Sequence, residues 1–280
     1  MPVIWGTDTT FDLYAEVDAT DYKLTFHANT KADNIDIEKI AIPGVDKSVD
    51  EIYAFYTVES DNIKFPTADD AIRKENRIFA GWYDENDLFG SNNGKCYKSL
   101  EKGNIGDKEY WARWLSLEPN TENEYTEVIP ATGTVKASMA LYLYYTYDKK
   151  TKTNNYLNSN KNYFSIDINV DKNNDSEEEI TTQVPVKVWL STNADPDNVD
   201  DRLGWTMQCD GKDISEKDSS NVYTTVDNST ITVQCPNKLE DFVKANGKDS
   251  RKVYLHVKTN SENVGTMSVN IVKRSIYDQH

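Results

Sequence analysis

The sequence predicts a mainly β protein, and three observations favour this fold class. Tyrosine (17) outnumbers phenylalanine (8), and Thr, Val, Asn and Asp are plentiful, which is the composition of strands joined by polar turns. Short segments alternate strictly between apolar and polar residues. Helical periodicity is clear in only one short stretch. We therefore expect antiparallel sheets with one buried and one solvated face.

Five segments carry the alternation, with apolar side chains on one face and polar side chains on the other. They are residues 23–28, 164–170, 184–190, 252–258 and 267–272. The predicted inward faces of the first three are Leu24, Phe26 and Ala28; Phe164, Ile166, Ile168 and Val170; and Val184, Val186, Val188 and Leu190. Pro185 has no backbone N–H to donate, so it predicts an edge position for its strand.

One short helix is expected at residues 236–247. Leu239, Phe242 and Val243 fall on one helical face, and Gly247 supplies a C-terminal stop. This stretch is the exception in a chain otherwise composed of strands and turns.

Two aromatic runs, residues 78–83 (IFAGWY) and 110–114 (YWARW), are the most unusual feature of the first half. A small sheet module buries little apolar surface, so large aromatic side chains are an efficient way to build its core. We therefore expect Trp82 and Trp114 to be buried packing residues. Alternation places Phe79, Gly81 and Tyr83 on one face and Ala80 and Trp82 on the other, and it separates Tyr110, Ala112 and Trp114 from Trp111 and Arg113. Gly81 leaves room for a neighbouring group beside Trp82.

Three motifs occur in order: YKLTFHAN at Tyr22–Asn29, FAGWY at Phe79–Tyr83 and WARW at Trp111–Trp114. In this order they resemble the internalin B-type repeat, also called the Listeria–Bacteroides repeat, over about residues 8–116. Asn76 stands where that repeat usually has glycine, and asparagine is the next best residue for a left-handed turn. Two departures are visible: TKAD replaces the usual Gly-Gly after Asn29, and residues 36–60 lengthen the module.

The resemblance implies a β-grasp-like module of the kind found in large surface and secreted proteins, where it serves as spacer, presentation stalk or adhesive unit. It implies no catalytic residues. Residues 13–17 (LYAEV) look like the closing strand of a preceding repeat, with Val17 in place of the closing Trp.

We expect four segments along the chain: residues 1–19 as the tail of a preceding repeat or an N-terminal strand, 20–116 as the repeat module, 117–180 as a β module and 181–280 as a β-sandwich module. The polar stretches at residues 116–133 and 171–185 mark the boundaries, the second as either a linker or a long hairpin loop. The short alternating strands after residue 120 favour one or two immunoglobulin-like sandwiches.

Three cysteines are too few for a disulfide framework, and their spacing does not fit zinc. Cys209 and Cys235 both fall in phase with a predicted core face. The sequence leaves two interpretations open: a disulfide across two strands, or two buried thiols that act as small core residues.

The charge distribution excludes some partners. The formal net charge is −16, so a nucleic acid or an anionic membrane surface is not expected as partner. No apolar run approaches the length of a membrane span. The first ten residues lack the basic and apolar regions of a signal peptide. Two interpretations follow: the chain is a piece of an exported protein whose leader is removed, or it never passes through a secretion channel.

No enzyme motif is present, and we expect no catalytic, cofactor-binding or metal-binding residues. Of the three histidines, His27 and His256 lie on polar faces of predicted strands and His280 is terminal. No nucleophile elbow, His-Glu-x-x-His pair or phosphate loop occurs. A pair of carboxylates acting together on a sandwich remains open, but solvated surface carboxylates are the favoured interpretation of the 47 acidic residues.

One acidic run partly matches a calcium loop. Asp171, Asn173, Asp175 and Glu177 occupy positions 1, 3, 5 and 7 of that pattern, but Ser176 replaces the glycine and Thr182 the bidentate glutamate. Residues 194–201 fail similarly. A solvated turn is the favoured interpretation of both loops.

The aromatic residues also raise a carbohydrate-binding hypothesis. An exposed Trp189, or the tyrosines of residues 142–147, would stack on sugar faces. The alternative is that tyrosine simply favours strands and their edges.

Together these features predict a non-enzymatic extracellular or cell-surface protein that acts as spacer, adhesin or assembly module. Its expected partners are a protein or glycan on a host or neighbouring cell, or other copies of itself. The alternative is a structural protein of a virion or extracellular filament. A third hypothesis is a carbohydrate-binding module of a secreted glycan-processing protein.

Overall fold

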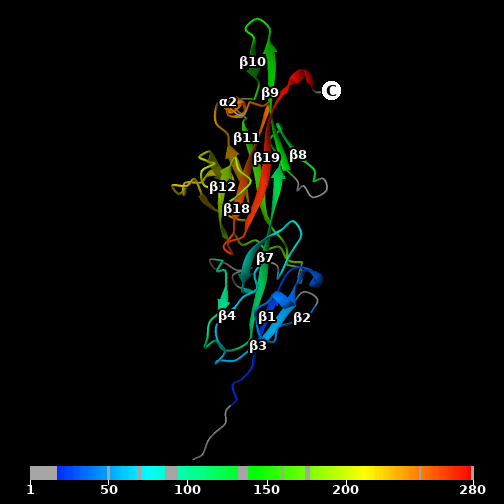
Figure 1. The fold of residues 1–280 in the computed structure, drawn as a ribbon, viewed down its shortest axis with the longest axis vertical. Coiled ribbons are helices and arrows are strands. Elements are labelled where there is room, and N and C mark those ends of the chain that lie inside the picture. The colour runs from blue at the N-terminus through cyan, green and yellow to red at the C-terminus, as the bar shows by residue number, and fades with distance from the viewer. Residues whose placement is uncertain are drawn as a thin grey trace, which may run out of the picture.

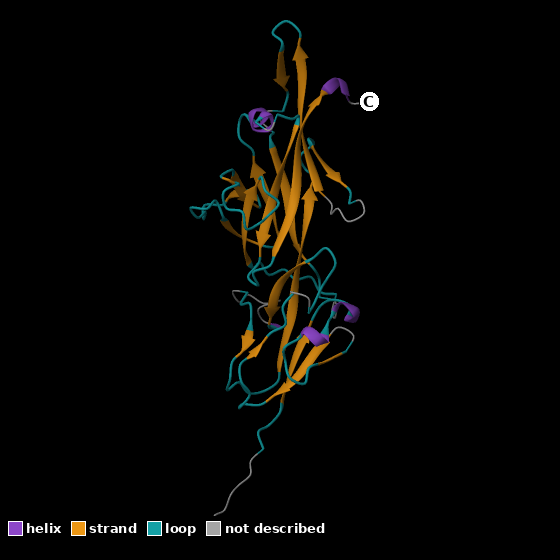
Figure 2. Ribbon diagram, in the orientation of Figure 1, coloured by secondary structure: helices purple, strands orange, loops and turns teal. Residues whose placement is uncertain are grey.

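The computed structural model describes residues 18–48, 51–68, 71–85, 94–131, 138–158, 161–173, 177–245 and 247–278. These residues form an elongated, mainly β molecule, as predicted (Figures 1 and 2). Beside the strands, the part of the chain that the structure describes includes the short helix α2 (Leu239–Lys244) and the 3-10 turns η1 (Ala32–Asn34), η2 (Ile37–Lys39) and η3 (Ile276–Asp278). No helix in the described residues is long and apolar enough to span a membrane.

Two packed units follow one another along the long axis (Figure 1). The first unit contains β1 (Tyr22–His27), β2 (Asp46–Lys47), β3 (Glu51–Tyr56), β4 (Ile63–Lys64), β5 (Ile78–Tyr83) and β6 (Ser99–Leu100). The second unit contains β8 (Thr126–Ile129), β9 (Ser138–Asp148), β10 (Thr153–Tyr156), β11 (Tyr163–Val170), β12 (Pro185–Ser191), β13 (Arg202–Leu203), β14 (Thr206–Cys209), β15 (Lys212–Asp213), β16 (Tyr223–Val226), β17 (Ser229–Gln234), β18 (Ser250–Lys258) and β19 (Val264–Ser275). Strand β7 (Lys108–Asn120) belongs to both units.

The strands form two large mixed sheets and a small one. The first sheet has the order β15-β14-β17-β11-β7-β1-β3-β2, with β5 also paired to β7. The second has the order β10-β9-β19-β18-β12-β13, with β16 on β12 and β8 on β9. Strands β4 and β6 form a separate pair. Most pairs are antiparallel, but β1 runs parallel to β7 and β9 runs parallel to β19.

Strand β7 connects the two units without a break. Its first residues pair with β1, its middle with β5 and its last residues with β11. Leu115 is paired on both sides, with Ile78 of the first unit and Val170 of the second. The strand therefore crosses the position between residues 116 and 117 at which the sequence predicts a domain boundary.

The first unit is built around aromatic side chains. Trp82 and Trp114 are 1% and 2% exposed, which confirms that both are packing residues. Their indole nitrogens donate hydrogen bonds to the carbonyl oxygens of Pro66 and Ala28, at 2.7 and 2.8 Å. Each indole thus keeps a polar partner inside the core, as buried Trp residues require. Phe26 packs 4.9 Å from the Trp82 ring.

The two aromatic runs differ in how well alternation predicts their faces. In β7, Tyr110, Ala112 and Trp114 share the first core, as predicted. In β5, the predicted faces are wrong, because a β-bulge between Phe79 and Gly81 shifts the register. Phe79 and Trp82 therefore point into the same core. Ala80 contributes to the core of the second unit instead.

The second unit buries a single core between its two sheets. Phe164, Ile166 and Ile168 of β11 lie in it, as predicted, with the inward residues of β12, β18 and β19. The edge position predicted for β12 is wrong, since β16 and β18 pair on its two sides. Pro185 is tolerated because it is the first residue of the strand and pairs only toward β16.

The predicted helix and left-handed turn are confirmed. Helix α2 buries Leu239 and Val243, and Gly247 beyond it has φ +66°. Asn76 ahead of β5 has φ +55°.

Cys209 and Cys235 do not form a disulfide, and Cys96 is also free. Cys209 pairs with Ile231 across the β14–β17 ladder, whereas Cys235 lies four residues further along the chain, directly after β17. At about 3.3 Å per residue this is roughly 13 Å, about twice the Cα separation that a disulfide spans. Burial raises the pKa of the Cys235 thiol.

The four predicted segments remain predictions. Residues 1–17, and with them most of the predicted tail of a preceding repeat, lie outside the described residues. Residues 117–180 and 181–280 both contribute to the one core of the second unit.

Candidate functional site: the junction between the two units

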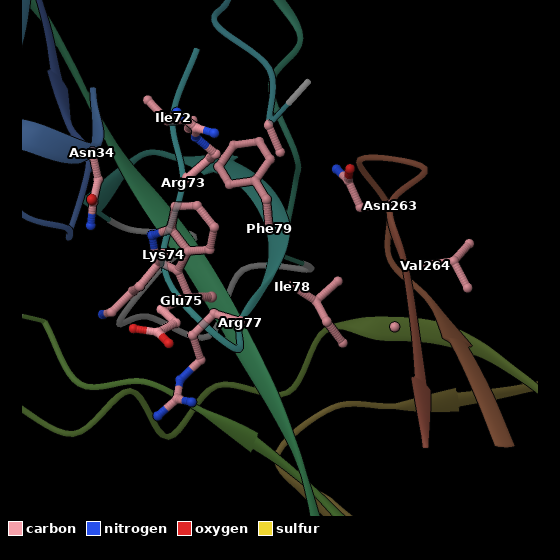
Figure 3. Close-up of a pocket in the computed structure, with 13 residues that line it drawn as sticks. Asn34, Ile72, Arg73, Lys74, Glu75, Arg77, Ile78, Phe79, Asn263 and Val264 are labelled. Carbon is pink, nitrogen blue, oxygen red and sulfur yellow. The ribbon is translucent and has the colours of Figure 1, made fainter. Parts of the chain in front are cut away.

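A cavity with a volume of about 500 Å³ lies where the two units meet. Its first-unit wall comes from the segment that leads into β5, including Ile72, Lys74, Ile78 and Phe79. Its second-unit wall comes from Asn263 of the β18–β19 turn and from Val264 and Gly265 at the start of β19, which lie opposite that segment (Figure 3). The cavity is therefore a feature of the junction, and its role depends on the contacts between the two units around it.

Asp171, directly after β11, makes one set of junction contacts. Its carboxylate accepts a hydrogen bond from Arg77 Nε at 2.7 Å and lies 2.8 Å from Lys74 Nζ. Lys74 and Arg77, which line the cavity, thus form ion pairs with the Asp171 carboxylate of the second unit. Nearby, Asn29 Nδ2 donates to the Lys172 carbonyl oxygen at 2.9 Å.

These contacts bear on the calcium-loop pattern. The Asp171 carboxylate pairs with Lys74 and Arg77. Thr182 Oγ1 accepts a hydrogen bond from the guanidinium of Arg113. Asn173 is 6% exposed, and Asp175 and Ser176 lie outside the described residues. In residues 194–201, Asp195 Oδ1 accepts the Asp197 N–H within its own turn. Across the described residues, no three His, Cys, Asp or Glu side chains are placed to hold a metal ion.

A buried ion pair lies at the centre of the junction. Arg113 of β7 and Asp227 of the β16–β17 turn both have fully buried side chains. Arg113 Nε and Nη2 each donate to one carboxylate oxygen of Asp227 at 2.8 Å. Asp227 also accepts the Val184 N–H at 2.7 Å. This two-pronged geometry is the strong form of an Arg–carboxylate contact.

Tyr83 and Val184 enclose this ion pair. The Arg113 guanidinium lies 5.9 Å from the Tyr83 ring centroid, and Tyr83 and Val184 form a small apolar cluster with Ile180. Burial raises the pKa of the Tyr83 hydroxyl. The arrangement excludes water from two opposite charges and holds them in one geometry.

The β18–β19 turn is fastened directly to β5. Thr259 and Ser261 both donate their hydroxyl hydrogens to the Phe79 carbonyl oxygen, at 3.1 and 2.7 Å. This carbonyl lies beside the β-bulge. Close packing continues at Gly265, where an added Cβ would lie 1.9 Å from Ile78 Cδ1. The junction is thus joined through backbone, hydroxyl and ionic contacts.

His27 and His256 do not line the junction cavity. His27 stacks on Trp111 with ring centroids 4.6 Å apart, and its Nε2 lies 3.1 Å from Glu109. His256 is on the outer face of β18, but it is fully buried, because Asn193 of the loop after β12 covers it. Burial lowers the pKa of His256, so its imidazole is neutral at physiological pH.

The predicted exposure of Trp189 is wrong. Its side chain is 3% exposed and stacks on His256, with ring centroids 5.3 Å apart. The Arg202 guanidinium lies over the Trp189 ring, 5.0 Å from its centroid. Of the tyrosines in residues 142–147, Tyr147 is 51% exposed and the others are half-buried.

Sequence reasoning missed the Arg113–Asp227 pair. The signal was a single arginine within an otherwise aromatic and apolar strand, YWARWL. A buried arginine requires a buried anionic partner, but 114 residues separate the two, so nothing in the sequence identified which of many carboxylates it would be.

The class that this architecture defines is a mainly β protein with two large mixed sheets and an internally fastened junction. No family model matches the chain, and no curated protein matches it. Two crystal structures from Bacillus cereus are distantly similar: a variant of BcpA, the major pilin subunit, and BcpA itself. Both are 10% identical to this chain, and each alignment covers 91% of it. The TM-scores are 0.26 for the variant and 0.25 for BcpA, and the alignments cover 70% and 69% of those two chains. These TM-scores are too low to define a shared fold.

Proposed function

We propose that this chain is a rigid, non-enzymatic module of an extracellular surface protein, acting as spacer, adhesin or assembly unit. The observation that carries the proposal is strand β7, which is hydrogen-bonded to β1 and β5 in one unit and to β11 in the other. Domains joined by a linker move relative to one another by default. A shared strand supplies no such linker, so the two units form one rod.

The path of the chain supports the spacer role. The described chain enters beside β1 at one end of the long axis and leaves after β19 at the opposite end (Figure 1). A module with this path holds whatever is attached before it and after it at a fixed separation.

The strand arrangement supports the finer fold proposals. In the first unit, β1 lies parallel to β7, with β3 antiparallel beyond β1 and β5 antiparallel beyond β7. This order fits a β-grasp-like repeat of the internalin B type. The two facing sheets of the second unit fit an immunoglobulin-like sandwich.

Nuclear spin relaxation tests the rigidity on which the proposal depends. Backbone ¹⁵N relaxation of the full chain is expected to fit one anisotropic rotational diffusion tensor for the amides of both units. Two separately tumbling units, each with its own tensor, would contradict the spacer role. Labelling of intact producing cells with an antibody raised against this chain tests the location, and staining seen only after lysis would exclude the cell surface.

The carbohydrate-binding hypothesis loses one of its two supports, because Trp189 is buried beneath Arg202. The filament alternative is supported by the exposed apolar and charged side chains at the two ends of the rod.

A further inference from the structure

Exposed large apolar side chains gather at the two ends of the molecule. Nine such side chains occur in the described residues, and six of them lie near the two ends of the molecule. Phe55, Val58 and Ile105 are 61%, 42% and 62% exposed at the end where β1 begins. Tyr147, Leu157 and Tyr277 are 51%, 54% and 74% exposed around the β9–β10 hairpin and the C-terminal turn η3. These side chains offer apolar surface at each end that a partner could cover.

The β9–β10 hairpin projects beyond the rest of the second unit (Figure 1). Its tip carries the exposed side chains of Lys149, Lys150 and Lys152. The one carboxylate of residues 146–155, Asp148, accepts the backbone N–H of Lys150 and so shapes the turn. Three lysines against one aspartate make this tip basic in a chain of net charge −16.

The opposite end consists of three segments that are hydrogen-bonded together, residues 18–23, 57–64 and 101–108. Asp107 Oδ1 accepts the Lys23 N–H at 2.8 Å, and Asn62 Nδ2 donates to Glu101 at 2.7 Å. These segments hold six carboxylates against four lysines: Asp18, Asp21, Glu59, Asp61, Glu101 and Asp107 against Lys23, Lys64, Lys102 and Lys108. This end, the loop end, is therefore acidic, and Asp61 is 99% exposed.

We propose that the hairpin end of one copy of this chain docks on the loop end of a second copy. Basic and apolar groups at one end face acidic and apolar groups at the other, which is the complementarity that brings two protein surfaces together. The contact joins different surfaces at opposite ends of a rod, so its repetition gives an open filament. This inference rests on the proposed assembly role and specifies the partner and the surfaces.

The overall negative charge does not oppose such a contact. Interactions between exposed charges are largely screened beyond a Debye length of about 8 Å at physiological salt. In end-to-end docking the acidic bodies stay apart along the axis, whereas the tip lysines and the loop carboxylates meet at short range. Side-by-side contact would bring the acidic bodies together instead.

Two charge-reversed variants of the full chain test the proposal. The first carries Lys149→Glu, Lys150→Glu and Lys152→Glu, and the second carries Asp21→Lys, Glu59→Lys and Asp61→Lys. All six residues are exposed, so both variants are expected to fold. A control matched to the first variant carries Lys31→Glu, Lys39→Glu and Lys212→Glu, which makes the same change in net charge at positions away from both ends.

Sedimentation velocity at physiological salt, from micromolar to sub-millimolar chain, gives the readout. We expect the native chain and the control to grow into longer species as concentration rises. Each reversed variant alone is expected to associate on the order of tenfold more weakly or not at all, because its two ends carry like charge. An equimolar mixture of the two variants is expected to recover association, since each tip then meets a loop end of opposite charge.

Three results would overturn the inference: a native chain that stays monomeric throughout, reversed variants that associate like the control, or a mixture that does not recover. A monomeric chain with a single rotational diffusion tensor would overturn this inference alone and leave the rigid-spacer proposal standing. Two independent tensors would overturn the spacer proposal whatever the state of association.

Discussion

Arg113 shows how one side chain joins parts of the chain that lie far apart in sequence. Its guanidinium contacts Asp227 and Thr182, which follow it by 114 and 69 positions. Removing two charges from water is costly, and the pair is retained because its hydrogen bonds are well placed on both partners. The bond from Val184 N to Asp227 adds a third donor to that carboxylate.

At this scale we predict that Arg113→Met lowers the free energy of unfolding by about 3–5 kcal/mol, because Asp227 is left buried without its partner. Urea unfolding followed by tryptophan fluorescence measures the change. The double variant Arg113→Met with Asp227→Leu removes both charges and is expected to lose less than the single variant. A single variant within about 0.5 kcal/mol of the native chain would mean that the pair is dispensable.

At the scale of single elements, β5 is the strand in which a simple pattern fails. Alternation assigns Phe79 and Trp82 to opposite faces, yet the bulge between Phe79 and Gly81 places both in one core. Gly81 has φ +116°, and the Cys96 side chain occupies the space beside it. The sequence indicated that a neighbouring group could lie beside Gly81. It did not indicate the extra residue in the ladder, because a bulge depends on the partner strand.

We predict that Gly81→Ala destabilises the chain more than Gly103→Ala. An added Cβ at Gly81 would lie 2.3 Å from Cys96 Sγ, whereas nothing lies within 4 Å at Gly103, where φ is +88°. Gly103→Ala therefore reports the backbone strain alone, about 1–3 kcal/mol, and Gly81→Ala adds an overpacking cost of about 1–3 kcal/mol. Chemical denaturation of both variants gives the comparison.

The variant Gly81→Ala with Cys96→Ala separates the two contributions at Gly81. It is expected to recover part of the difference, because it removes the sulfur but keeps the positive φ. Equal costs for Gly81→Ala and Gly103→Ala would show that Cys96 moves aside freely.

At the scale of the whole molecule, the sequence predicted the local features of single strands better than the way in which the strands pair into two units. The inward faces of residues 23–28 and 164–170 were predictable because a half-buried strand imposes a period of two. Burial of Trp82 and Trp114 followed from the size of their rings. Strand β7, shared by two units, was not predictable, because a polar stretch after residue 116 has the composition of a linker and pairing partners leave no local signal.

Alkaline pH is predicted to unfold the molecule. Burial raises the pKa of Tyr110 to about 12, against about 10 in an unfolded chain. The folded state thus favours the protonated phenol, and its stabilising contribution is complete below pH 10 and lost as the pH rises toward 12. Far-ultraviolet circular dichroism and absorbance at the phenolate band should therefore change together in this range.

Tyr110→Phe is expected to move the alkaline transition to higher pH, since no phenol is left to ionise at that buried position. Tyr147→Phe, at a side chain that is 51% exposed, is the matched control and should leave the midpoint unchanged. Phenolate formation by every tyrosine while the dichroism stays native would contradict the burial of Tyr110.

The two parallel pairings have a mechanical consequence. The first strand, β1, is held beside β7, and the last, β19, is held beside β9. Tension applied through the chain on either side pulls β1 and β19 along their own lengths in opposite directions. The hydrogen bonds of each ladder lie across that pull, so they share the load and must fail together rather than open one at a time. The same ladders that shape the molecule therefore suit it to bear tension.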